Sequence, residues 1–504
     1  NGYKKYNSRA CFHDHRERGR LVRFAGIFRV LGLLICLFSI TLIPPALIAL
    51  WYQDGGGLAF LVAFSVSIVV GFCVWYPNRK QHADLKVRDG FLLTVLFWSV
   101  LGCVGILPFW FIGELRLSFT DAAFESFSGL TTTGATVLSG LETFPHSILY
   151  YRQQLQWLGG MGIIVLAVAI LPMLGIGGMQ LYRAEIPGPL KDAKMTPRIA
   201  DTAKHLWYIY VALTLICALA YKLAGMHWFD AIGHAFSTVS VGGFSTYDAN
   251  LGYFDSALIN TICAVFLLLS AVNFAVHYAA ITGRSLRSYT RDSEVRAFML
   301  VQVTLLLVVF ITLLAQQVFS SPGETFNQAL IQSVSISTTA GFTTTDFSVW
   351  PLFVPILLIL ARFIGGCASS TGGGLKVVRV VLLVRQGIRE LNRLVHPQGV
   401  YSVKLGSRIV PPRVVEAVWG FFAAYALVFV VIMLGLLATG LDQVTAFSAV
   451  AACLNNLGPG IGEVVKNYAE ISSTAKWLLI VAMLFGRLEV FTILVLLTPS
   501  FWRS

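Results

Sequence analysis

Long apolar segments recur along the whole chain of 504 residues and dominate its hydrophobic pattern. Polar and basic stretches separate them. A helix of about 20 apolar residues is long enough to cross the hydrocarbon core of a bilayer. We therefore expect ten membrane-spanning segments, at residues 24–51, 58–75, 91–112, 148–174, 202–224, 260–283, 295–316, 352–383, 414–439 and 475–497.

Between four pairs of these segments lies a shorter apolar stretch that ends in a polar loop containing glycine. In each stretch a polar residue stands thirteen positions before a glycine and is followed by alanine; these residues are Asp121, Asp230, Gln328 and Thr445. Four copies in register are an internal repeat. Each repeat predicts a span, a half-helix too short to cross, a loop and a second span. Because every copy begins and ends on the same side, the four are parallel and can surround one pseudo-fourfold axis.

Such loops are suited to binding a cation. Irregular backbone at membrane depth is tolerated only where it is buried in protein or lines water, and a ring of carbonyl oxygens can replace the hydration shell of an alkali cation. Glycine with a positive φ would let carbonyls turn toward the axis. The half-helices would direct their negative C-terminal ends at the ring, with Asp121, Asp230 and Thr445 as N-caps at the other ends.

The residues available in the loops are mostly neutral, which favours a monovalent cation over a divalent one and K⁺ before Na⁺. The alternative is that these are packing loops without an ion. The candidate ion-binding residues are Thr131, Thr132, Thr133, Gly134, Ser240, Val241, Gly242, Gly243, Thr338, Thr339, Ala340, Gly341, Asn455, Asn456, Leu457 and Gly458.

Composition and charge support a membrane protein. Hydrophobic residues make up 56% of the chain and charged residues only 12%, against about 25% charged in soluble domains. This excludes a soluble enzyme, a disulfide scaffold and a disordered protein. The net charge is +12. Most Lys and Arg residues cluster in alternate connections and at both ends, so the positive-inside rule places both termini in the cytoplasm and requires no nucleic-acid partner.

One predicted span, 352–383, is interrupted by glycine. Because glycine costs about 1 kcal/mol relative to alanine inside a helix, we expect a break here; a tight packing surface of small residues is the alternative. No G-x-x-x-x-G-K-[ST] signature is present, so this is not a nucleotide-binding loop. The interrupting residues are Gly365, Gly366, Cys367, Ala368, Ser369, Ser370, Thr371, Gly372, Gly373 and Gly374.

Several charged residues fall within or beside the predicted spans. Arg487 lies near the middle of the last span, where a charge is costly unless it faces a polar cavity or a partner. Glu489 cannot share its helix face, so we expect Glu489 to contact another element such as the glycine-rich loop; a buried ion pair is the alternative. Arg362 either influences the glycine-rich loop or snorkels, extending its charged end to the membrane surface. Arg152 and Glu125 are expected to anchor the first half-helix. His234 is expected to pack within the second half-helix.

The loops TTTGA, SVGGF, TTAGF and NNLGPG resemble those of the Trk/Ktr/HKT superfamily of potassium transporters. The runs 154–173, 182–190, 364–377 and 484–493 are most similar to the membrane subunit of bacterial Trk systems. The resemblance implies an all-α integral membrane protein with four parallel M1–P–M2 repeats around a pseudo-fourfold pore, plus an extra N-terminal helix pair. It also implies that the candidate ion-binding residues form a K⁺ selectivity filter. The glycine-rich loop, with Arg487 and Glu489, would be the gate.

The same resemblance implies a homodimer in the bacterial inner membrane, in contact with lipid. A cytosolic TrkA-type nucleotide-binding subunit would gate it. The nucleotide, NAD or ATP/ADP, would bind only that partner. This chain would carry no cofactor, and K⁺ would be the transported ion rather than a resident metal.

The predicted parts are the N-terminal tail 1–23 (a natural extension or a remnant of cloning), the helix pair 24–89, and repeats 90–200, 201–293, 294–412 and 413–504. The main alternative function is a symporter that couples K⁺ to H⁺ or Na⁺. Ionisable residues on the transport path are typical of such carriers, and Arg487 and Arg362 are the main deep candidates. An integral-membrane enzyme is disfavoured because we find no converging acid, base, nucleophile or metal cluster.

Overall fold

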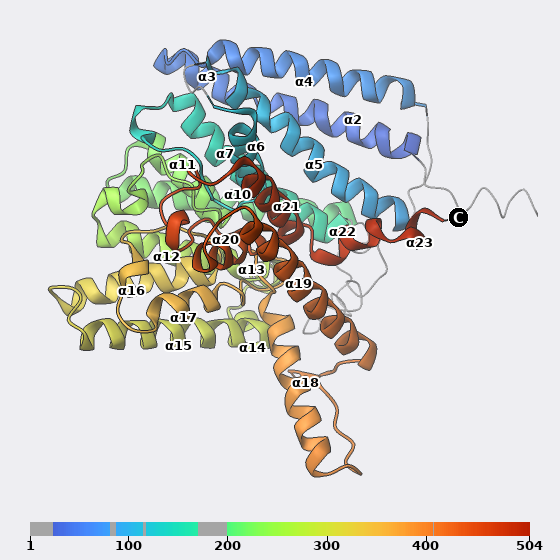
Figure 1. Ribbon diagram of the computed structural model, residues 1–504, viewed down its shortest axis with the longest axis vertical. Coiled ribbons are helices and arrows are strands. Elements are labelled where there is room, and N and C mark those ends of the chain that lie inside the picture. Colours follow the sequence, from blue (N-terminus) through green and yellow to red (C-terminus); the bar gives the residue numbers. More distant parts are fainter. Residues whose placement is uncertain (1–23, 81–86, 114–116, 170–198, 407, 504) are drawn as a thin grey trace, which may run out of the picture.

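The computed structural model describes residues 24–80, 87–113, 117–169, 199–406 and 408–503, and it is built almost entirely of helices (Figure 1). Within these ranges six helices are long and apolar enough to cross a membrane, or eight if each of two strongly bent pairs is one span. The chain is therefore a multi-pass membrane protein. The predicted tail 1–23 and the run 182–190 lie outside the described residues.

The N-terminal helix pair lies along one side of the molecule, in blue in Figure 1. The first predicted span forms two helices, α2 (Phe24–Ile40) and α3 (Ile43–Tyr52), because two prolines begin the second. Helix α4 (Gly57–Asn78) packs against α2. A Cβ on Gly32 would lie 2.6 Å from the backbone nitrogen of Trp75. The small residue thus lets the two helices approach closely.

Four short helices lie in the interior, one from each sequence repeat. None exceeds 16 residues, or about 24 Å at 1.5 Å per residue, so none crosses a membrane. Most of their residues are buried although many are polar. The four helices are α6 (Phe119–Leu130), α11 (Trp228–Val239), α16 (Pro322–Ser337) and α20 (Gln443–Leu454).

The prediction that Asp121, Asp230 and Thr445 are N-caps was wrong. Each lies in the first turn instead, three residues after the capping position. In α20 the cap is Asp442, whose carboxylate accepts hydrogen bonds from Val444 and Thr445. Hydrogen bonding from Thr445 holds the pKa of Asp442 below its ordinary value. The two first-turn aspartates still place negative charge at the positive ends of α6 and α11.

Longer helices surround the short ones. Besides α4, four predicted spans are long helices close to their predicted positions, and α7 is the described part of another. Figure 1 shows α15 and α16 side by side, as their contacts require. The helices are α5 (Val87–Phe111), α7 (His146–Ala169), α10 (Ile199–Leu223), α15 (Ser293–Ala315) and α19 (Pro412–Ala438).

Three other predicted spans are broken. The glycine-rich span divides into α17 (Val354–Ala361) and α18 (Val377–Val395) around irregular backbone, as predicted. Two other predicted spans are bent, by 91° between α12 and α13 and by 110° between α21 and α22. The chain turns where Asn273 caps α13 and where Glu489 adopts a φ of 58° before α22. These helices are α12 (Ala257–Ala271), α13 (Phe274–Thr282), α21 (Ser473–Arg487) and α22 (Val490–Leu497).

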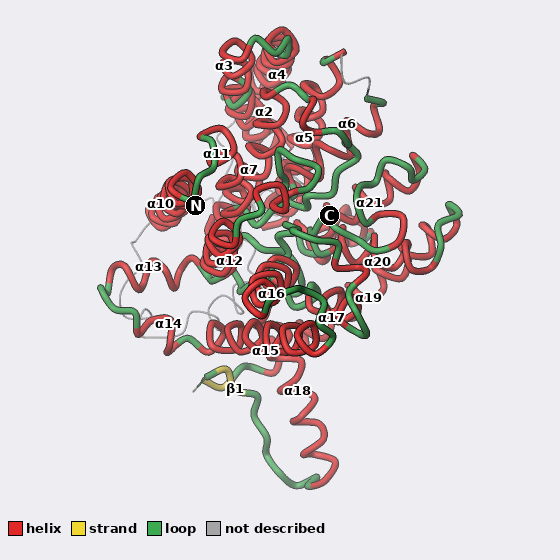
Figure 2. The backbone as a smooth tube through the Cα atoms, turned by 90° about the vertical axis from the view of Figure 1, so that its left-hand side faces the viewer, coloured by secondary structure: helices red, strands yellow, loops and turns green. Residues whose placement is uncertain are grey.

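The second half of α18 projects from the body, followed by a small hairpin (Figures 1 and 2). The hairpin pairs β1 with β2 in antiparallel fashion, with Lys404 opposite Ile409. Short elements complete the described chain. They are η2 (Leu141–Thr143), η4 (Asn250–Phe254), α14 (Arg287–Arg291), η5 (Phe347–Val349), β1 (Lys404–Leu405), β2 (Arg408–Ile409), η6 (Gly462–Val464) and α23 (Pro499–Trp502).

Candidate ion pathway

The four loops that follow the short helices share one backbone path. The second residue of each has a positive φ: 55° at Thr132, 57° at Val241, 72° at Thr339 and 53° at Asn456. The next N–H donates to a carbonyl five residues back, at 2.8–3.0 Å in all four loops. This is the Schellman ending of a helix, which ordinarily places glycine at the left-handed position. Three of the four residues are β-branched, so the strain recurs at equivalent places.

The recurring position of glycine in the four loops has two structural causes. Gly134, Gly243 and Gly341 have φ values of 77°, 80° and 87°, as predicted. The same prediction was wrong for Gly458, whose φ is not positive. It precedes Pro459, and a residue before proline is restricted to extended backbone. Glycine is required there by a neighbour instead, because a Cβ on Gly458 would lie 2.3 Å from the carbonyl oxygen of Gly134.

Equivalent contacts join each loop to the next. A Cβ on Gly134 would lie 2.0 Å from the oxygen of Gly242 in the second loop, and one on Gly243 would lie 2.2 Å from the oxygen of Ala340 in the third. A Cβ on Gly341 would lie 3.2 Å from the nitrogen of Gly458 in the fourth. Since the fourth loop also contacts the first, the loops close into a ring. All sixteen candidate ion-binding residues lie in it.

Polar side chains of the ring are engaged in holding the loops. Asn455 accepts a hydrogen bond from Tyr425 at 2.9 Å and donates to Ala451 at 2.7 Å. Asn456 donates to the carbonyl of Met483 at 2.9 Å and to the hydroxyl of Thr133 in the first loop at 3.2 Å. These side chains therefore position the backbone rather than project freely.

A cavity of about 540 Å³ opens at one end of the ring. All four ring glycines line it, together with residues that follow them, including Thr136, Asp248, Asp346 and Lys466. The cavity thus lies at the end of the loops farther from the short helices.

The glycine-rich loop lies at the opposite end of the ring. The Thr371 hydroxyl donates to the carbonyl of Val239, the last residue of α11, at 3.1 Å. The N–H of Gly373 donates to the hydroxyl of Thr339 in the third loop at 2.6 Å. A Cβ on Gly373 would lie 2.1 Å from the oxygen of Asn455 in the fourth. One short segment therefore contacts three of the four helix–loop junctions.

Arg487 connects this segment to the remaining junction. Its guanidinium donates to the carbonyl of Thr371 at 3.1 Å and to that of Gly159 on α7 at 2.9 Å. Gly159 in turn abuts the first junction, because a Cβ there would lie 1.8 Å from the oxygen of Leu130. Arg487 is only 2% exposed. A buried positive charge thus lies beside the glycine-rich loop.

The rest of the glycine-rich loop is folded back on itself and fastened at its sides. A Cβ on Gly365 would lie 2.2 Å from the oxygen of Gly373, so the two ends of the loop adjoin. The N–H of Ala368 donates to the carboxylate of Glu294 on α15 at 2.7 Å. The ammonium of Lys376 donates to the carbonyl of Gly372. The predicted gate residues between Gly365 and Gly374 therefore form one compact unit, which includes Gly366, Ser369 and Ser370.

Glu489 contacts another element, as expected, and that element is α18, the helix that follows the glycine-rich loop. Its carboxylate pairs with Arg379 at 2.8 Å, and the pair is partly exposed, so the alternative of a fully buried ion pair does not hold. The break after α21 turns Glu489 away from Arg487 to become the N-cap of α22. Glu489 therefore fastens the helix that follows the loop rather than the loop itself.

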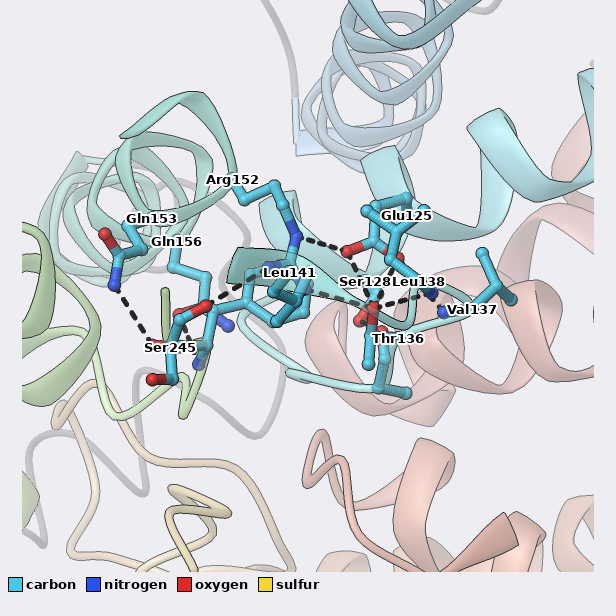
Figure 3. Close-up of polar contacts among 12 residues, drawn as sticks. Glu125, Ser128, Thr136, Val137, Leu138, Leu141, Arg152, Gln153, Gln156 and Ser245 are labelled. Carbon is cyan, nitrogen blue, oxygen red and sulfur yellow. Dashed lines mark hydrogen bonds and ion pairs between the residues drawn. The ribbon is translucent and has the colours of Figure 1, made fainter. Parts of the chain in front are cut away.

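Arg152 and Glu125 form a buried ion pair beside the first loop (Figure 3). The Arg152 Nε and Glu125 Oε1 atoms are 2.6 Å apart, and the two side chains are 1% and 0% exposed. Arg152 also donates to the hydroxyl of Thr136 at 3.0 Å and to the carbonyl of Ser245, beyond the second loop, at 3.2 Å. The pair anchors α6, as expected, and in addition joins two repeats.

Two glutamines that sequence reasoning missed support the second loop. Gln156 donates to the carbonyl of Gly242 at 2.7 Å and accepts from the N–H of Phe244 at 3.1 Å. Gln153 donates to the carbonyl of Phe244 at 3.3 Å. Both lie on α7, near Arg152 (Figure 3). The available signal was a row of polar residues, one helical turn apart, within an otherwise apolar predicted span.

Two remaining side chains have defined positions. His234 bonds within α11 to the carbonyl of Asp230 at 2.8 Å and to the hydroxyl of Ser245 at 2.9 Å, in keeping with a packing role. Arg362 is fully buried and donates to the carbonyl of Pro459 at 3.1 Å. The possibility that Arg362 snorkels is therefore wrong. In the described ranges no group of three His, Cys, Asp or Glu residues could hold a metal ion.

Comparison with known proteins identifies relatives over nearly the whole chain. This chain is 62% identical to the Trk system potassium uptake protein TrkH of Vibrio parahaemolyticus serotype O3:K6 (strain RIMD 2210633). The match extends over 485 residues, which are 96% of this chain and 100% of that protein. The chain is 41% identical to the Trk system potassium uptake protein TrkG of Escherichia coli (strain K12) over 473 residues, 94% of this chain and 97% of that protein.

The fold matches a solved structure. The crystal structure of the potassium transporter TrkH from Vibrio parahaemolyticus superimposes with a TM-score of 0.89 at 59% identity, covering 95% of this chain and 100% of that one. Residues 56–504 match the family model TrkH, described as a cation transport protein. With the family model and these relatives in agreement, the chain belongs to the TrkH family of cation transport proteins.

Proposed function

We propose that this protein takes up K⁺ across the bacterial cytoplasmic membrane, with the ring of four loops as its selectivity filter. The observation that carries the proposal is the closed ring of glycine-containing loops between a cavity and the glycine-rich loop. The relatives are potassium uptake proteins by name. In this proposal the repeats are four parallel M1–P–M2 units around a pseudo-fourfold pore.

Ion preference would come from the backbone. Carbonyl oxygens without a ring of carboxylates suit a weakly hydrated monovalent ion. The short helices end directly before the loops, so their negative C-terminal ends would add to the attraction for a cation. Loops held by Gln156, Asn455 and Asn456 would keep the carbonyls in place as ions pass.

The glycine-rich loop would be the gate, in a closed position. Segment 371–373 lies against the ends of the loops that join the short helices. The positive charge of Arg487 beside this segment would repel cations. Conduction would require this segment to leave the ring and the hydrogen bond from Arg487 to Thr371 to break. Lys376 and Glu294 would limit how far the loop travels.

Gly374→Val is expected to raise K⁺ flux in the absence of any partner, about tenfold or more, without changing ion preference. Gly374 has a φ of 77°, and a Cβ there would lie 2.8 Å from the Cα of Gly365. Strain of about 1–3 kcal/mol would thus fall on the closed loop. Gly387→Val, on α18 where a Cβ meets nothing within 4 Å, is the control. Altered selectivity with unchanged flux, measured in liposomes, would contradict the gate assignment.

The name of the relatives describes a system, and we propose that this chain acts with a second component. A homodimer would bind a cytosolic TrkA-type subunit whose nucleotide controls opening. The projecting α18 is suited to receive it, since it follows the glycine-rich loop directly and carries Arg379, Arg385, Arg389 and Arg393. Movement of α18 would then pull on the gate.

Flux into sealed liposomes containing only the purified protein tests the function. We expect uptake of K⁺ and Rb⁺ well above Na⁺ and Li⁺, with or without a proton gradient. Uptake that requires the gradient would favour the coupled symporter instead. Equal uptake of all four ions would contradict a selective carbonyl ring.

A further inference from the structure

Each loop of the ring is held by a side-chain hydrogen bond at the same backbone position. The carbonyl of the residue that follows the ring glycine accepts a hydrogen bond from a side chain in every repeat. The accepting residues are Ala135, Phe244, Phe342 and Pro459. This position comes directly after the candidate ion-binding residues, so the donor helps to set the geometry and the charge of the ring.

Three of the four donors are neutral. In the first and third loops the donor is a serine hydroxyl seven residues earlier on the short helix, Ser128 at 2.5 Å and Ser335 at 2.7 Å. In the second loop it is the amide of Gln153, at 3.3 Å. In the fourth the equivalent position on the short helix is Ala452, which has no hydroxyl. Arg362 supplies the bond instead, at 3.1 Å from the oxygen of Pro459.

The fourth donor therefore differs from the others in carrying a full charge. Arg362 is 0% exposed. The ionisable groups that surround it are Tyr425, Cys453 and Tyr468, none of which is a carboxylate. Its Nε and Nη2 atoms have no acceptor among the residues described. Burial of a cation without a counter-ion is costly, and in the first and third repeats a neutral hydroxyl makes the equivalent bond.

Arg362 lies between the backbone of the fourth loop and that of the glycine-rich loop. The hydroxyl of Tyr468 donates to the carbonyl of Gly458 at 2.8 Å. The successive carbonyls of Gly458 and Pro459 therefore both accept side-chain hydrogen bonds. The carbonyl of Arg362 itself abuts the glycine-rich loop, at 3.0 Å from a Cβ on Gly374. Arg362 thus contacts the ring through its guanidinium and the candidate gate through its backbone, and its full burial keeps the charge beside both.

We propose that Arg362 is an affinity-determining residue: its hydrogen bond shapes the fourth loop, and its fixed charge weakens cation binding in the ring. This inference rests on the proposed potassium function. Weak binding speeds release of the ion, which conduction requires as much as capture. At an effective dielectric constant of about 20, a unit charge about 10 Å from an ion changes its affinity roughly tenfold. Because K⁺ and Na⁺ feel the same repulsion, the charge should change affinity and leave preference alone.

Two variants separate the charge from the hydrogen bond. Arg362→Gln keeps a neutral donor, and Arg362→Met with Ala452→Ser moves the donor to the short helix as in the first and third repeats. Titration of the purified full chain with KCl in choline chloride, followed by calorimetry, should give a Kd for K⁺ about tenfold lower for either variant. The ratio of the Kd values for K⁺ and Na⁺ should be unchanged. Arg362→Lys keeps the charge and should retain the higher Kd.

The results that would overturn this proposal differ from those that would contradict the proposed potassium function. A Kd equal to that of the unaltered protein in either folded neutral variant would overturn the proposal and leave Arg362 as a hydrogen-bond donor only. A changed ratio of the two Kd values would overturn it as well, since a geometric effect would then dominate. An unaltered protein that binds no K⁺ would instead contradict the proposed function. Thermal unfolding of each variant identifies those that are folded.

Discussion

Gly134→Ala is expected to abolish selective K⁺ uptake, whereas Gly140→Ala is expected to preserve it. Both glycines have nearly the same backbone conformation, with φ of 77° and 75°. A Cβ on Gly134 would lie 2.0 Å from the carbonyl oxygen of Gly242, while the nearest atom to a Cβ on Gly140 is 3.7 Å away, on Thr143. The two substitutions therefore share the strain of a left-handed alanine, about 1 kcal/mol, and differ only in the ring contact.

Liposome uptake of K⁺ and Na⁺ measures the difference. The displaced Gly242 carbonyl would change the spacing between the first and second loops, so we expect the preference for K⁺ to fall by at least about tenfold, or 1.4 kcal/mol. Thermal unfolding shows whether each variant is folded. Normal selectivity in a folded Gly134→Ala protein would show that this contact does not shape the ion path.

Arg152→Met is expected to destabilise the protein by about 3–5 kcal/mol, because it leaves the carboxylate of Glu125 buried and unpaired. It also removes the bonds from Arg152 to Thr136 and Ser245, which join the first and second repeats. The matched control is Arg393→Met, whose pair with Glu390 on α18 is half-exposed. Such an exposed pair contributes about 0–1 kcal/mol.

Unfolding in detergent, followed by tryptophan fluorescence across a denaturant series, compares the two variants. Replacing both partners, with Glu125→Leu and Arg152→Met, should recover part of the lost stability, since no uncompensated charge then remains. Equal stability of Arg152→Met and Arg393→Met would contradict the anchoring role. A double variant less stable than Arg152→Met would show that Glu125 is stabilised independently of its partner.

The repeats and the break in one span were predictable because they depend on local chemistry. The fixed distance from a polar residue to glycine recurs four times, and glycine weakens a helix wherever it occurs. The same reasoning failed where a contact with a residue distant in the sequence determines the need for glycine. At Gly458 the requirement for glycine comes from a contact with the first loop more than 300 residues away, which no local pattern contains.

Strained and bent backbone was also beyond prediction. Threonine and valine disfavour a positive φ, so nothing in the sequence marks Thr132 or Val241 as left-handed. The bend at Glu489, where a non-glycine residue has a φ of 58°, likewise has no marker in the sequence. Arg362 shows the limit most clearly. Its position in an apolar run indicated a special residue, but only the missing hydroxyl at Ala452 and the fold together reveal which bond it supplies.

The most direct test of the central claim is to locate bound cations by anomalous diffraction. Crystals of the purified protein grown in K⁺ or Rb⁺ should show anomalous density on the axis of the ring, surrounded by residues 131–134, 240–243, 338–341 and 455–458. Crystals grown in Li⁺ alone should lose that density. Density found only outside the ring, at concentrations that support uptake into liposomes, would contradict the claim that these four loops form the selectivity filter.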